Sequence, residues 1–378
     1  MKIGILTQPL LKNYGGILQA YALQKVLREM GHEAWLVQRC RHTPSFRRWM
    51  SLYLRNIIKY LLGRKKYQRY KWVYRKAENQ QYANMQNFID EYITPKTSKI
   101  FSTRGLLKDY RLQHYDAYVV GSDQVWRPRY SPCQTDFYLG FLPLDEHIMR
   151  LAYAASFGTD KWEYSKRQSK YCRILLQKFN GISVREDSAI ELCSHYLGRN
   201  DVLQVLDPTL LLKKEEYECL ADTKQIAKKN KRVFCYVLDD NSTFKRLRND
   251  VAHNLDGECF TITFTGENSM PGPKTWLRAF MKADYVLTDS FHGCVFSIIF
   301  NKPFVVVGNE HRGQSRFHSL LNLFGLEDRL VTQLSGDIIV EHMRMPIQWD
   351  SINERKKKLR EFSLNFLQNY LGNLLLII

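Results

Sequence analysis

The chain has 378 residues, enough for about two domains with a core each. With 44% hydrophobic and 25% charged residues, its composition excludes collagen-like and intrinsically disordered chains. The eight cysteines form no Cys-x-x-Cys pair, so neither a zinc site nor a secreted disulfide framework is predicted, and we expect a cytoplasmic protein. No apolar run approaches the roughly 20 residues of a membrane span, and the first residues lack a signal-peptide pattern.

The first half of the chain alternates predicted strands and helices. A βαβ unit is predicted at the start of the chain, with a strand over residues 2–8, the loop Asn13-Tyr14-Gly15-Gly16, a helix over 17–30 and a strand over 32–38. Its glycine-rich first turn is typical of a loop that binds a ligand. Further strands are predicted at 115–120, 148–154 and 181–184, with a helix over 188–197. This alternation predicts a mostly parallel sheet in an N-terminal Rossmann-like domain of residues 1–205.

A basic helical insertion at about residues 44–92 interrupts this domain. Between Arg41 and Lys76 there are twelve Lys and Arg residues and no Asp or Glu, so this segment carries much of the net charge of +18. Trp, Tyr, Leu and Ile alternate with these cations, which is a basic amphipathic pattern. This pattern would be explained by binding to an anionic membrane surface or to an acidic substrate. The alternative is a helix whose basic face is solvated and whose apolar stripe packs on the protein. Nucleic acid is disfavoured because no known binding module is recognisable.

A second set of alternating elements follows the charged stretch at 213–231. Strands are predicted at 231–238, 259–264, 285–288 and 303–307, and helices at 275–281 and 293–300. We therefore assign residues 206–350 to a C-terminal Rossmann-like domain, and residues 351–378 to a helix that crosses back to the first domain. The predicted fold class is α/β, with two Rossmann-like domains that face a cleft.

The sequence Thr288-Asp289-Ser290-Phe291-His292-Gly293 is the strongest candidate site. It places polar residues between an apolar strand and a helix of small residues, where free backbone N–H groups attract phosphate or carboxylate. His292 would stand at the mouth of this anion site, where an imidazole exchanges protons near neutral pH. The alternative is that Asp289 or Ser290 only caps the helix and that His292 only packs.

Two other strand ends carry candidate residues. Val120-Gly121-Ser122-Asp123-Gln124-Val125-Trp126 offers Asp123 as a base and Trp126 as a sugar-stacking face, although Asp123 could also be a cap and Trp126 a core residue. Ser183-Val184-Arg185-Glu186 places Arg185 where its planar fork can hold a carboxylate or phosphate, with a salt bridge to Glu186 or Asp187 as the competing explanation.

Two more loops complete the set of candidate residues. Arg312 and Arg316 follow the strand at 303–307 and could converge on the same anion, or be solvated. Asn13, Tyr14 and Gly16 would meet the ligand from the opposite domain. No His, Cys, Asp and Glu cluster with metal-ligand spacing is apparent, so neither a metal nor a cofactor is predicted.

Taken together, the segments 13–23, 120–126, 183–186 and 288–293 resemble the polysaccharide pyruvyl transferase family, in the right order and over roughly residues 1–335. The resemblance implies a GT-B-like architecture and an enzyme that moves pyruvate from phosphoenolpyruvate, as a ketal, onto two hydroxyls of a sugar in a surface polysaccharide or its lipid-linked precursor. His292 matches the catalytic histidine, Arg185 an arginine proposed to bind phosphoenolpyruvate, and Asp123 lies in the loop associated with acceptor or catalytic function.

The resemblance and the residue patterns together give one set of expected roles. Catalysis is expected from His292 and Asp123, donor binding from Arg185, Ser290, Gly293, Arg312 and Arg316, and acceptor binding from Asn13, Tyr14, Gly16 and Trp126. Many members of the family have arginine where this chain has Ser290, so Arg312 or Arg316 would replace that ligand. The alternatives are a GT-B glycosyltransferase that uses a nucleotide sugar, and a non-catalytic protein that binds polysaccharide or a membrane surface. Residues 41–76 would hold the enzyme peripherally on the inner face of the membrane.

Overall fold

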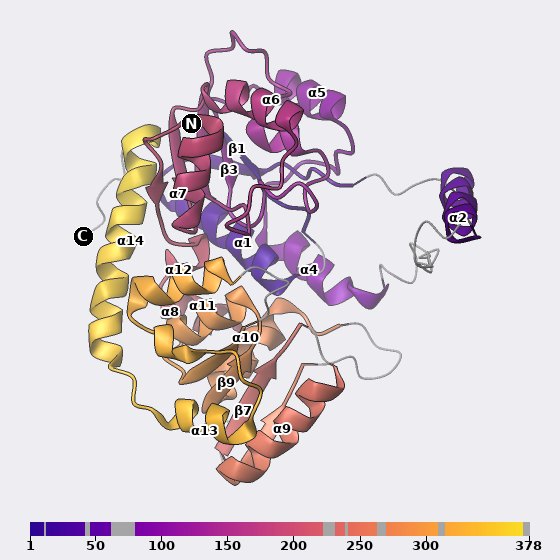
Figure 1. Ribbon diagram of the computed structural model, residues 1–378. Coiled ribbons are helices and arrows are strands. Elements are labelled where there is room, and N and C mark those ends of the chain that lie inside the picture. Colours follow the sequence, from indigo (N-terminus) through magenta and orange to yellow (C-terminus); the bar gives the residue numbers. More distant parts are fainter. Residues whose placement is uncertain are drawn as a thin grey trace.

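Two parallel β-sheets with helices on their faces form two lobes in the computed structural model (Figure 1). The structure describes residues 1–10, 13–41, 46–61, 80–221, 231–238, 241–262, 270–308 and 314–372. The strand order is β2-β1-β3-β4-β5-β6 in the first sheet and β11-β10-β9-β7-β8 in the second. The predicted α/β class with two Rossmann-like units is therefore confirmed.

The first sheet is built from short apolar strands, and β3 is buried along its whole length. Its strands are β1 (Lys2–Leu6), β2 (Glu33–Leu36), β3 (Ala117–Gly121), β4 (Met149–Ala155), β5 (Gly181–Val184) and β6 (Leu203–Gln204). Its helical segments are α1 (Tyr14–Glu29), α4 (Ala83–Tyr92), α5 (Thr103–Gln113), η1 (Gln134–Tyr138), α6 (Lys166–Leu176), α7 (Ser188–Leu192) and η2 (Cys193–Leu197).

The second sheet repeats this design with five strands. They are β7 (Lys231–Tyr236), β8 (Gly257–Phe260), β9 (Tyr285–Thr288), β10 (Phe304–Val307) and β11 (Leu330–Val331). The helices are η3 (Pro208–Leu210), α8 (Lys214–Ala221), α9 (Ser242–Leu255), α10 (Pro273–Lys282), α11 (Phe291–Ile299), α12 (Ser315–Phe324), η5 (Glu327–Arg329), α13 (Gly336–Arg344) and α14 (Trp349–Leu371).

Each sheet reverses its direction of growth at one point. In the first sheet β1 lies between β2 and β3, and in the second β7 lies between β8 and β9. The chain thus builds first to one side and then to the other, so the loops after β1 and β3, and those after β7 and β9, diverge and leave a crevice. Such reversal points at the carboxyl ends of parallel strands are where α/β sheets bind ligands.

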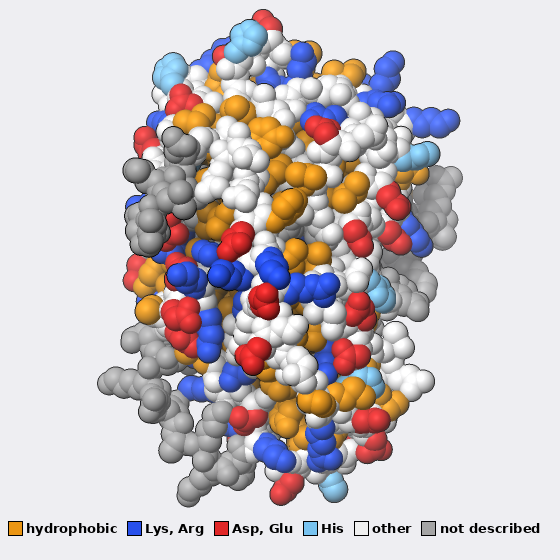
Figure 2. Space-filling view, turned by 90° about the vertical axis from the view of Figure 1, so that its left-hand side faces the viewer, with side chains coloured by type: hydrophobic (Ala, Val, Ile, Leu, Met, Phe, Trp, Pro, Cys, Tyr) orange, Lys and Arg blue, Asp and Glu red, His pale blue; other side chains and the backbone are white. Residues whose placement is uncertain are grey.

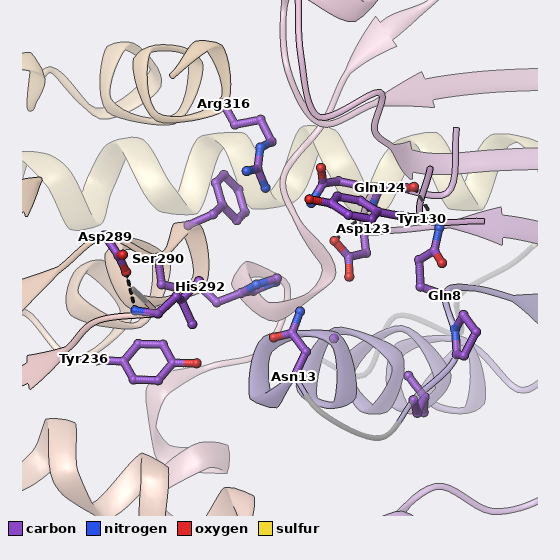
Figure 3. A pocket seen from close by; sticks show the side chains of 15 residues that line it. Gln8, Asn13, Asp123, Gln124, Tyr130, Tyr236, Asp289, Ser290, His292 and Arg316 are labelled. Atoms are coloured by element: carbon purple, nitrogen blue, oxygen red, sulfur yellow. Dashed lines mark hydrogen bonds between the residues drawn. The ribbon is translucent and has the colours of Figure 1, made fainter. Parts of the chain in front are cut away.

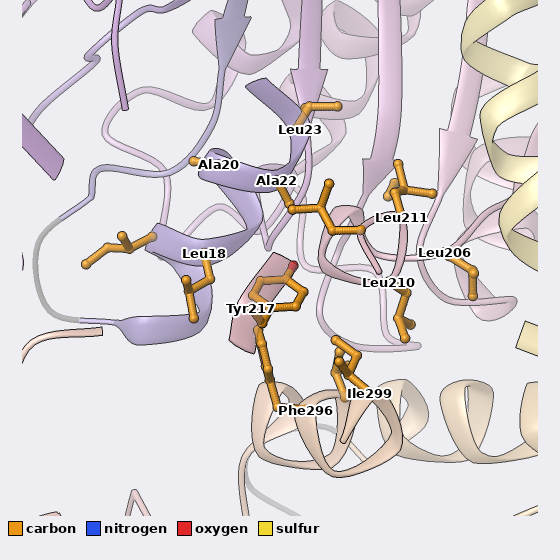
Figure 4. Packing of buried hydrophobic residues seen from close by; sticks show 14 of the residues in the cluster. Leu18, Ala20, Ala22, Leu23, Leu206, Leu210, Leu211, Tyr217, Phe296 and Ile299 are labelled. Carbon is orange, nitrogen blue, oxygen red and sulfur yellow. The ribbon is translucent and has the colours of Figure 1, made fainter. Parts of the chain in front are cut away.

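A continuous apolar core joins the two lobes (Figure 4). Leu18 and Leu23 of α1 pack in the same cluster as Leu210 of η3 and Phe296 of α11. Tyr217 of α8 lies between them, with its ring edge-on to Phe296 at 5.0 Å and its hydroxyl donating to the Thr209 carbonyl at 2.9 Å. Because a large apolar interface favours one relative placement of two domains, this core fixes the width of the crevice.

The last helix, α14, runs along both lobes (Figure 1). It touches the first sheet where the Leu206 N–H donates to the Ser363 hydroxyl at 3.0 Å and where the Phe366 ring packs on Tyr153 at 6.2 Å. Figure 2, which faces the α14 side, shows Lys and Arg interspersed with Asp and Glu across this face. The excess positive charge of the chain is therefore not gathered as one uninterrupted patch here.

The basic insertion contributes α2 (Phe46–Leu61), which stands apart from both lobes in Figure 1. Its Met50, Leu54, Ile58 and Leu61 side chains are exposed by 39%, 52%, 55% and 75%. Residues three and four apart share one face of a helix, so these four form an apolar stripe in contact with solvent. The alternative interpretation of the basic pattern, in which the apolar stripe packs on the body of the protein, is therefore wrong for these four side chains. Residues 62–79 of the predicted insertion lie outside the described part of the chain.

Two phenylalanines one turn apart on α14 test whether its apolar face anchors the helix. We expect Phe366→Ala to lower the free energy of unfolding by about 3–5 kcal/mol, because the buried ring leaves a cavity next to Tyr153. Phe362 is 48% exposed on the same helix, so Phe362→Ala should change the free energy by no more than about 0.5 kcal/mol. Urea unfolding of both variants gives the comparison, and equal losses would contradict this packing.

Candidate active site

A pocket of about 380 Å³ lies in the crevice between the lobes, where the two reversal points face each other (Figure 3). Loops after β1 and β3 form one wall, and loops after β7, β9 and β10 form the other. The lining residues are Gln8, Pro9, Leu10, Asn13, Gly16, Asp123, Gln124, Tyr130, Tyr236, Leu238, Asp289, Ser290, Phe291, His292 and Arg316. Of the eleven predicted site residues, the structure thus brings Asn13, Gly16, Asp123, Ser290, His292 and Arg316 together.

His292 occupies the second position of α11, at the end of β9. The Ser290 hydroxyl caps this helix by accepting the Gly293 N–H at 3.4 Å, so the helix begins where the strand stops. Gly293 lies below the pocket rather than in its lining, because its N–H is used by this cap and its Cα faces Thr288, whose Oγ1 would be 2.1 Å from an added Cβ. The predicted donor-binding role of Gly293 through that N–H is therefore not supported.

Asp207, which the sequence analysis did not single out, is the ionic partner of His292. Its Oδ2 lies 3.6 Å from the imidazole Nε2 and accepts hydrogen bonds from the Ser122 hydroxyl and the Arg185 guanidinium, each at 3.0 Å. Its Oδ1 accepts from the N–H and the hydroxyl of Thr209, at 3.0 and 2.7 Å. Burial disfavours the charge of this carboxylate, but the pKa of Asp207 is lowered because His292, Arg185 and Thr209 outweigh that cost.

Arg185 is buried beside this carboxylate and does not line the pocket. Its guanidinium lies 3.0 Å from Asp207, 3.7 Å from Asp123 and 3.9 Å from Glu186, and it stacks over the Phe291 ring at 4.3 Å. Burial disfavours its charge, yet the three carboxylates outweigh this effect and raise the pKa of Arg185. The predicted direct grip on a donor is not seen in this arrangement, because the guanidinium is buried outside the pocket lining and donates a hydrogen bond to Asp207.

Asp123 projects into the pocket from the tight turn after β3. Its backbone has a φ of 65°, which Asp tolerates better than most residues. Its Oδ1 accepts the Gln124 N–H at 2.9 Å, and the carboxylate points toward Asn13 on the same wall of the pocket (Figure 3). A carboxylate in this position can accept a proton from a substrate hydroxyl.

Arg316, in the first turn of α12, supplies the cationic wall of the pocket. Its guanidinium lies 5.9 Å from the centre of the Phe291 ring. Burial, together with the nearby charge of Arg185, lowers the pKa of Arg316 to about 10, so it remains charged at neutral pH. The other arginine predicted in this loop, Arg312, lies outside the described residues.

Two predicted acceptor residues are buried away from the pocket. Trp126 is 0% exposed, stacks on Tyr138 at 5.2 Å and donates its indole N–H to the Phe137 carbonyl, so it cannot offer a face to a sugar. Tyr14 is 3% exposed, stacks on Trp276 at 5.5 Å and donates its hydroxyl to the Pro271 carbonyl. Both predictions were wrong, because large aromatic rings next to a turn were needed to fill the core.

No group of three or more His, Cys, Asp or Glu side chains in the described residues is arranged to hold a metal ion. The buried Asp207 carboxylate is paired with the Arg185 guanidinium at 3.0 Å and lies 3.6 Å from the His292 imidazole.

The two adjacent glycines of α1 test how closely His292 is held. A Cβ on Gly15 would lie 2.0 Å from the imidazole, whereas a Cβ on Gly16 would meet nothing closer than 3.5 Å. We expect Gly15→Ala to lower the free energy of unfolding by about 1–3 kcal/mol, because the ring must move. Gly16→Ala should be neutral or slightly stabilising, since alanine favours a helix over glycine. Urea unfolding measures both, and an equal effect of the two substitutions would contradict the contact.

Solved structures with the same fold cover almost the whole chain. The UDP-GlcNAc 2-epimerase from Neisseria meningitidis bound to UDP-GlcNAc is 11% identical with a TM-score of 0.54, covering 98% of this chain and 99% of the other. The UDP-GlcNAc 2-epimerase from Methanocaldococcus jannaschii is 10% identical with a TM-score of 0.53, covering 96% and 99%. The trehalose-6-phosphate phosphatase N-terminal domain from Candida albicans is 11% identical with a TM-score of 0.51, covering 98% and 96%. These likenesses establish a GT-B-like fold.

The sequence itself gives the family. No curated protein matches the chain. The model of the family described as polysaccharide pyruvyl transferase matches residues 13–311, which include the pocket residues from Asn13 to His292. On the strength of this match over most of its length, the chain belongs to the polysaccharide pyruvyl transferase family.

Proposed function

We propose that this protein is a ketal-forming pyruvyl transferase, which moves pyruvate from phosphoenolpyruvate onto two hydroxyls of one sugar. The observation that carries the proposal is the pairing of His292 with the buried Asp207 at a pocket that also contains Asp123 and Arg316, in a chain of this family. An imidazole next to a carboxylate suits a general acid, and a carboxylate across the pocket suits a general base.

In the proposed reaction, protonated His292 gives its proton to the methylene carbon of phosphoenolpyruvate, which makes C2 electrophilic. A sugar hydroxyl then attacks C2 and loses its proton to Asp123. The second hydroxyl attacks the same carbon as the C2–O bond to phosphate breaks. This closes the cyclic ketal, and the second proton leaves with the phosphate. Asp207 would hold the imidazole in position throughout, as a buried carboxylate does for a catalytic histidine.

The donor's two anionic groups need positive charge on one side of the pocket. Arg316 and the N-terminal end of α11 at Ser290 would face the carboxylate and the phosphate. Arg185 would act indirectly, because it fixes Asp207 and supports the Phe291 ring from below. Arg316 would thus replace the arginine that many family members have at the position of Ser290. Asn13 and Gly16 lie on the wall from which an acceptor sugar would approach.

Turnover with phosphoenolpyruvate and a galactose-containing acceptor tests this reaction. We expect the protein to release inorganic phosphate in an acceptor-dependent manner, and His292→Asn to slow this release about 10²–10⁴-fold, because the proton donor is lost. The matched control is His318→Asn, since His318 is exposed on α12 and outside the pocket lining. It should leave the rate unchanged.

The same experiment with nucleotide sugars addresses the alternatives. Release of a nucleoside diphosphate in place of inorganic phosphate would identify a glycosyltransferase instead. Acceptor binding that is the same in wild type and His292→Asn, with no turnover of either donor class, would indicate a non-catalytic binding protein.

We further propose that α2 holds the enzyme on an anionic membrane surface, where a lipid-linked acceptor would be found. No helix in the described residues is long and apolar enough to cross a membrane, so the contact would be peripheral. The exposed apolar stripe of α2 suits insertion at the headgroup boundary. The four basic residues of α2, each worth about 1 kcal/mol near an anionic leaflet, would add electrostatic attraction.

Vesicle sedimentation tests this contact. We expect binding to vesicles of phosphatidylcholine with phosphatidylglycerol, weaker binding at high salt, and no binding after deletion of residues 44–76. Leu54→Ser with Ile58→Ser should also abolish sedimentation, since it removes half of the exposed stripe. Leu112→Ser with Leu144→Ser is the matched control, because these leucines are 67% and 51% exposed on the body of the protein. Unchanged sedimentation of the deletion variant would exclude the membrane contact.

A further inference from the structure

A second hollow lies beside the pocket and is lined by arginines. It has a volume of about 380 Å³ and is lined by Arg39, Arg41, Phe101, Pro128, Arg129, Ser131 and Pro132. We call it the arginine groove. None of these described lining residues is acidic, whereas the pocket beside it contains both Asp123 and Asp289.

The charges around the arginine groove do not balance. Arg39 is ion-paired with the buried Asp136 at 2.6 Å, and Arg127 and Arg129 share the single carboxylate of Glu163 at 3.2 and 3.1 Å. Arg41 donates to the Arg129 carbonyl at 2.7 Å, and the described residues give it no ionic partner. Together with Arg127, which shares Glu163 but does not line the groove, the three groove arginines make four guanidinium groups against two carboxylates, which leaves about two positive charges for an anion from outside.

The arginine groove adjoins the pocket and is close to α2 along the chain. Tyr130 lines the pocket while its chain neighbours Arg129 and Ser131 line the groove, and the pocket residue Gln8 donates to the Ser131 hydroxyl at 3.0 Å. Arg41, another lining residue of the groove, lies five residues before Phe46 in the sequence, and α2 begins at Phe46. That length of chain spans at most about 18 Å. The groove is thus next to the site of the proposed chemistry and a few residues along the chain from the helix with the exposed apolar stripe.

We infer that the arginine groove is an anion subsite that binds a phosphate or diphosphate group while a saccharide occupies the neighbouring pocket. Guanidinium groups bind phosphate oxygens in a bidentate manner, and the two unbalanced charges match such a group. The inference rests on the proposed function only in naming the occupant of the pocket. The anion would come from a carrier attached to the saccharide or from a phospholipid headgroup, and the subsite has the same chemistry in either case.

Titration calorimetry with inorganic pyrophosphate tests the subsite on the full chain. Arg41→Gln with Arg129→Gln should raise the dissociation constant at least about tenfold, because two charge-assisted contacts are lost. Both side chains are exposed, so folding should persist, and circular dichroism checks it. The matched control is Lys357→Gln with Lys358→Gln, which removes the same charge from α14 and should leave the affinity unchanged. Equal affinity of the arginine variant and wild type would overturn the subsite.

Competition separates this site from the donor pocket. Saturating phosphoenolpyruvate should leave pyrophosphate binding intact, and complete displacement would place pyrophosphate in the donor pocket and overturn the inference. If phosphoenolpyruvate does not bind while pyrophosphate binds and responds to Arg41 and Arg129, the donor assignment fails and the subsite stands.

The source of the anion follows from two competitors. Displacement of pyrophosphate by farnesyl diphosphate in detergent micelles, but not by phosphatidylglycerol vesicles, would identify a diphosphate carrier. Displacement by the vesicles would identify a headgroup. Both results support the subsite, and farnesol in the same micelles is the control that lacks the anion.

Discussion

The buried carboxylate of Asp207 is the interaction on which the site depends. It lies in the segment that leads from β6 to η3, and it joins Ser122 and Arg185 of the first lobe to His292 of the second. A buried charge is costly unless it is paired and hydrogen-bonded, and removal of one partner from such a pair typically costs about 3–5 kcal/mol. The cluster is therefore stable only when both lobes hold their loops in register. The apolar core around Tyr217 and Phe296 supplies that register.

Much of the architecture could be predicted from the sequence because it depends on local patterns. Apolar runs bounded by polar turns gave β1, β3, β5 and β9, and the loop after each strand pointed to the crevice. Asp123, Ser290 and His292 were found in this way, because chain order alone places them at carboxyl ends of strands. The helices α5, α6, α9, α12 and α13 were not predicted individually, since the stability of helices this short depends mostly on how their apolar faces pack.

The errors concern residues whose role is decided by contacts far along the chain. Asp207 resembles an ordinary Asp-Pro turn, and only the approach of Ser122 and His292 turns it into the ionic centre of the site. Trp126 and Tyr14 stand next to glycine turns like the true pocket residues, yet both rings fill the core. Arg185 is close to the pocket in space but is held beneath it by three carboxylates. No periodicity or spacing distinguishes these outcomes.

The layout of charge also bears on the position of Ser290, where we propose that Arg316 replaces the arginine of many family members. Two guanidinium groups lie near the Phe291 ring. That of Arg185 stacks closely on the ring, and that of Arg316 lies farther from the ring centre. The first is paired with the carboxylates of Asp123, Glu186 and Asp207, whereas the second lines the pocket itself. A further arginine at Ser290 would also take away the hydroxyl that caps α11 and fixes the start of the helix that carries His292. With the cap retained, we propose that the positive end of α11 and Arg316 divide the role of that arginine, while Asp123 faces them across the crevice. In the proposed reaction, this arrangement gives an anionic donor and a hydroxyl acceptor opposite walls of one pocket.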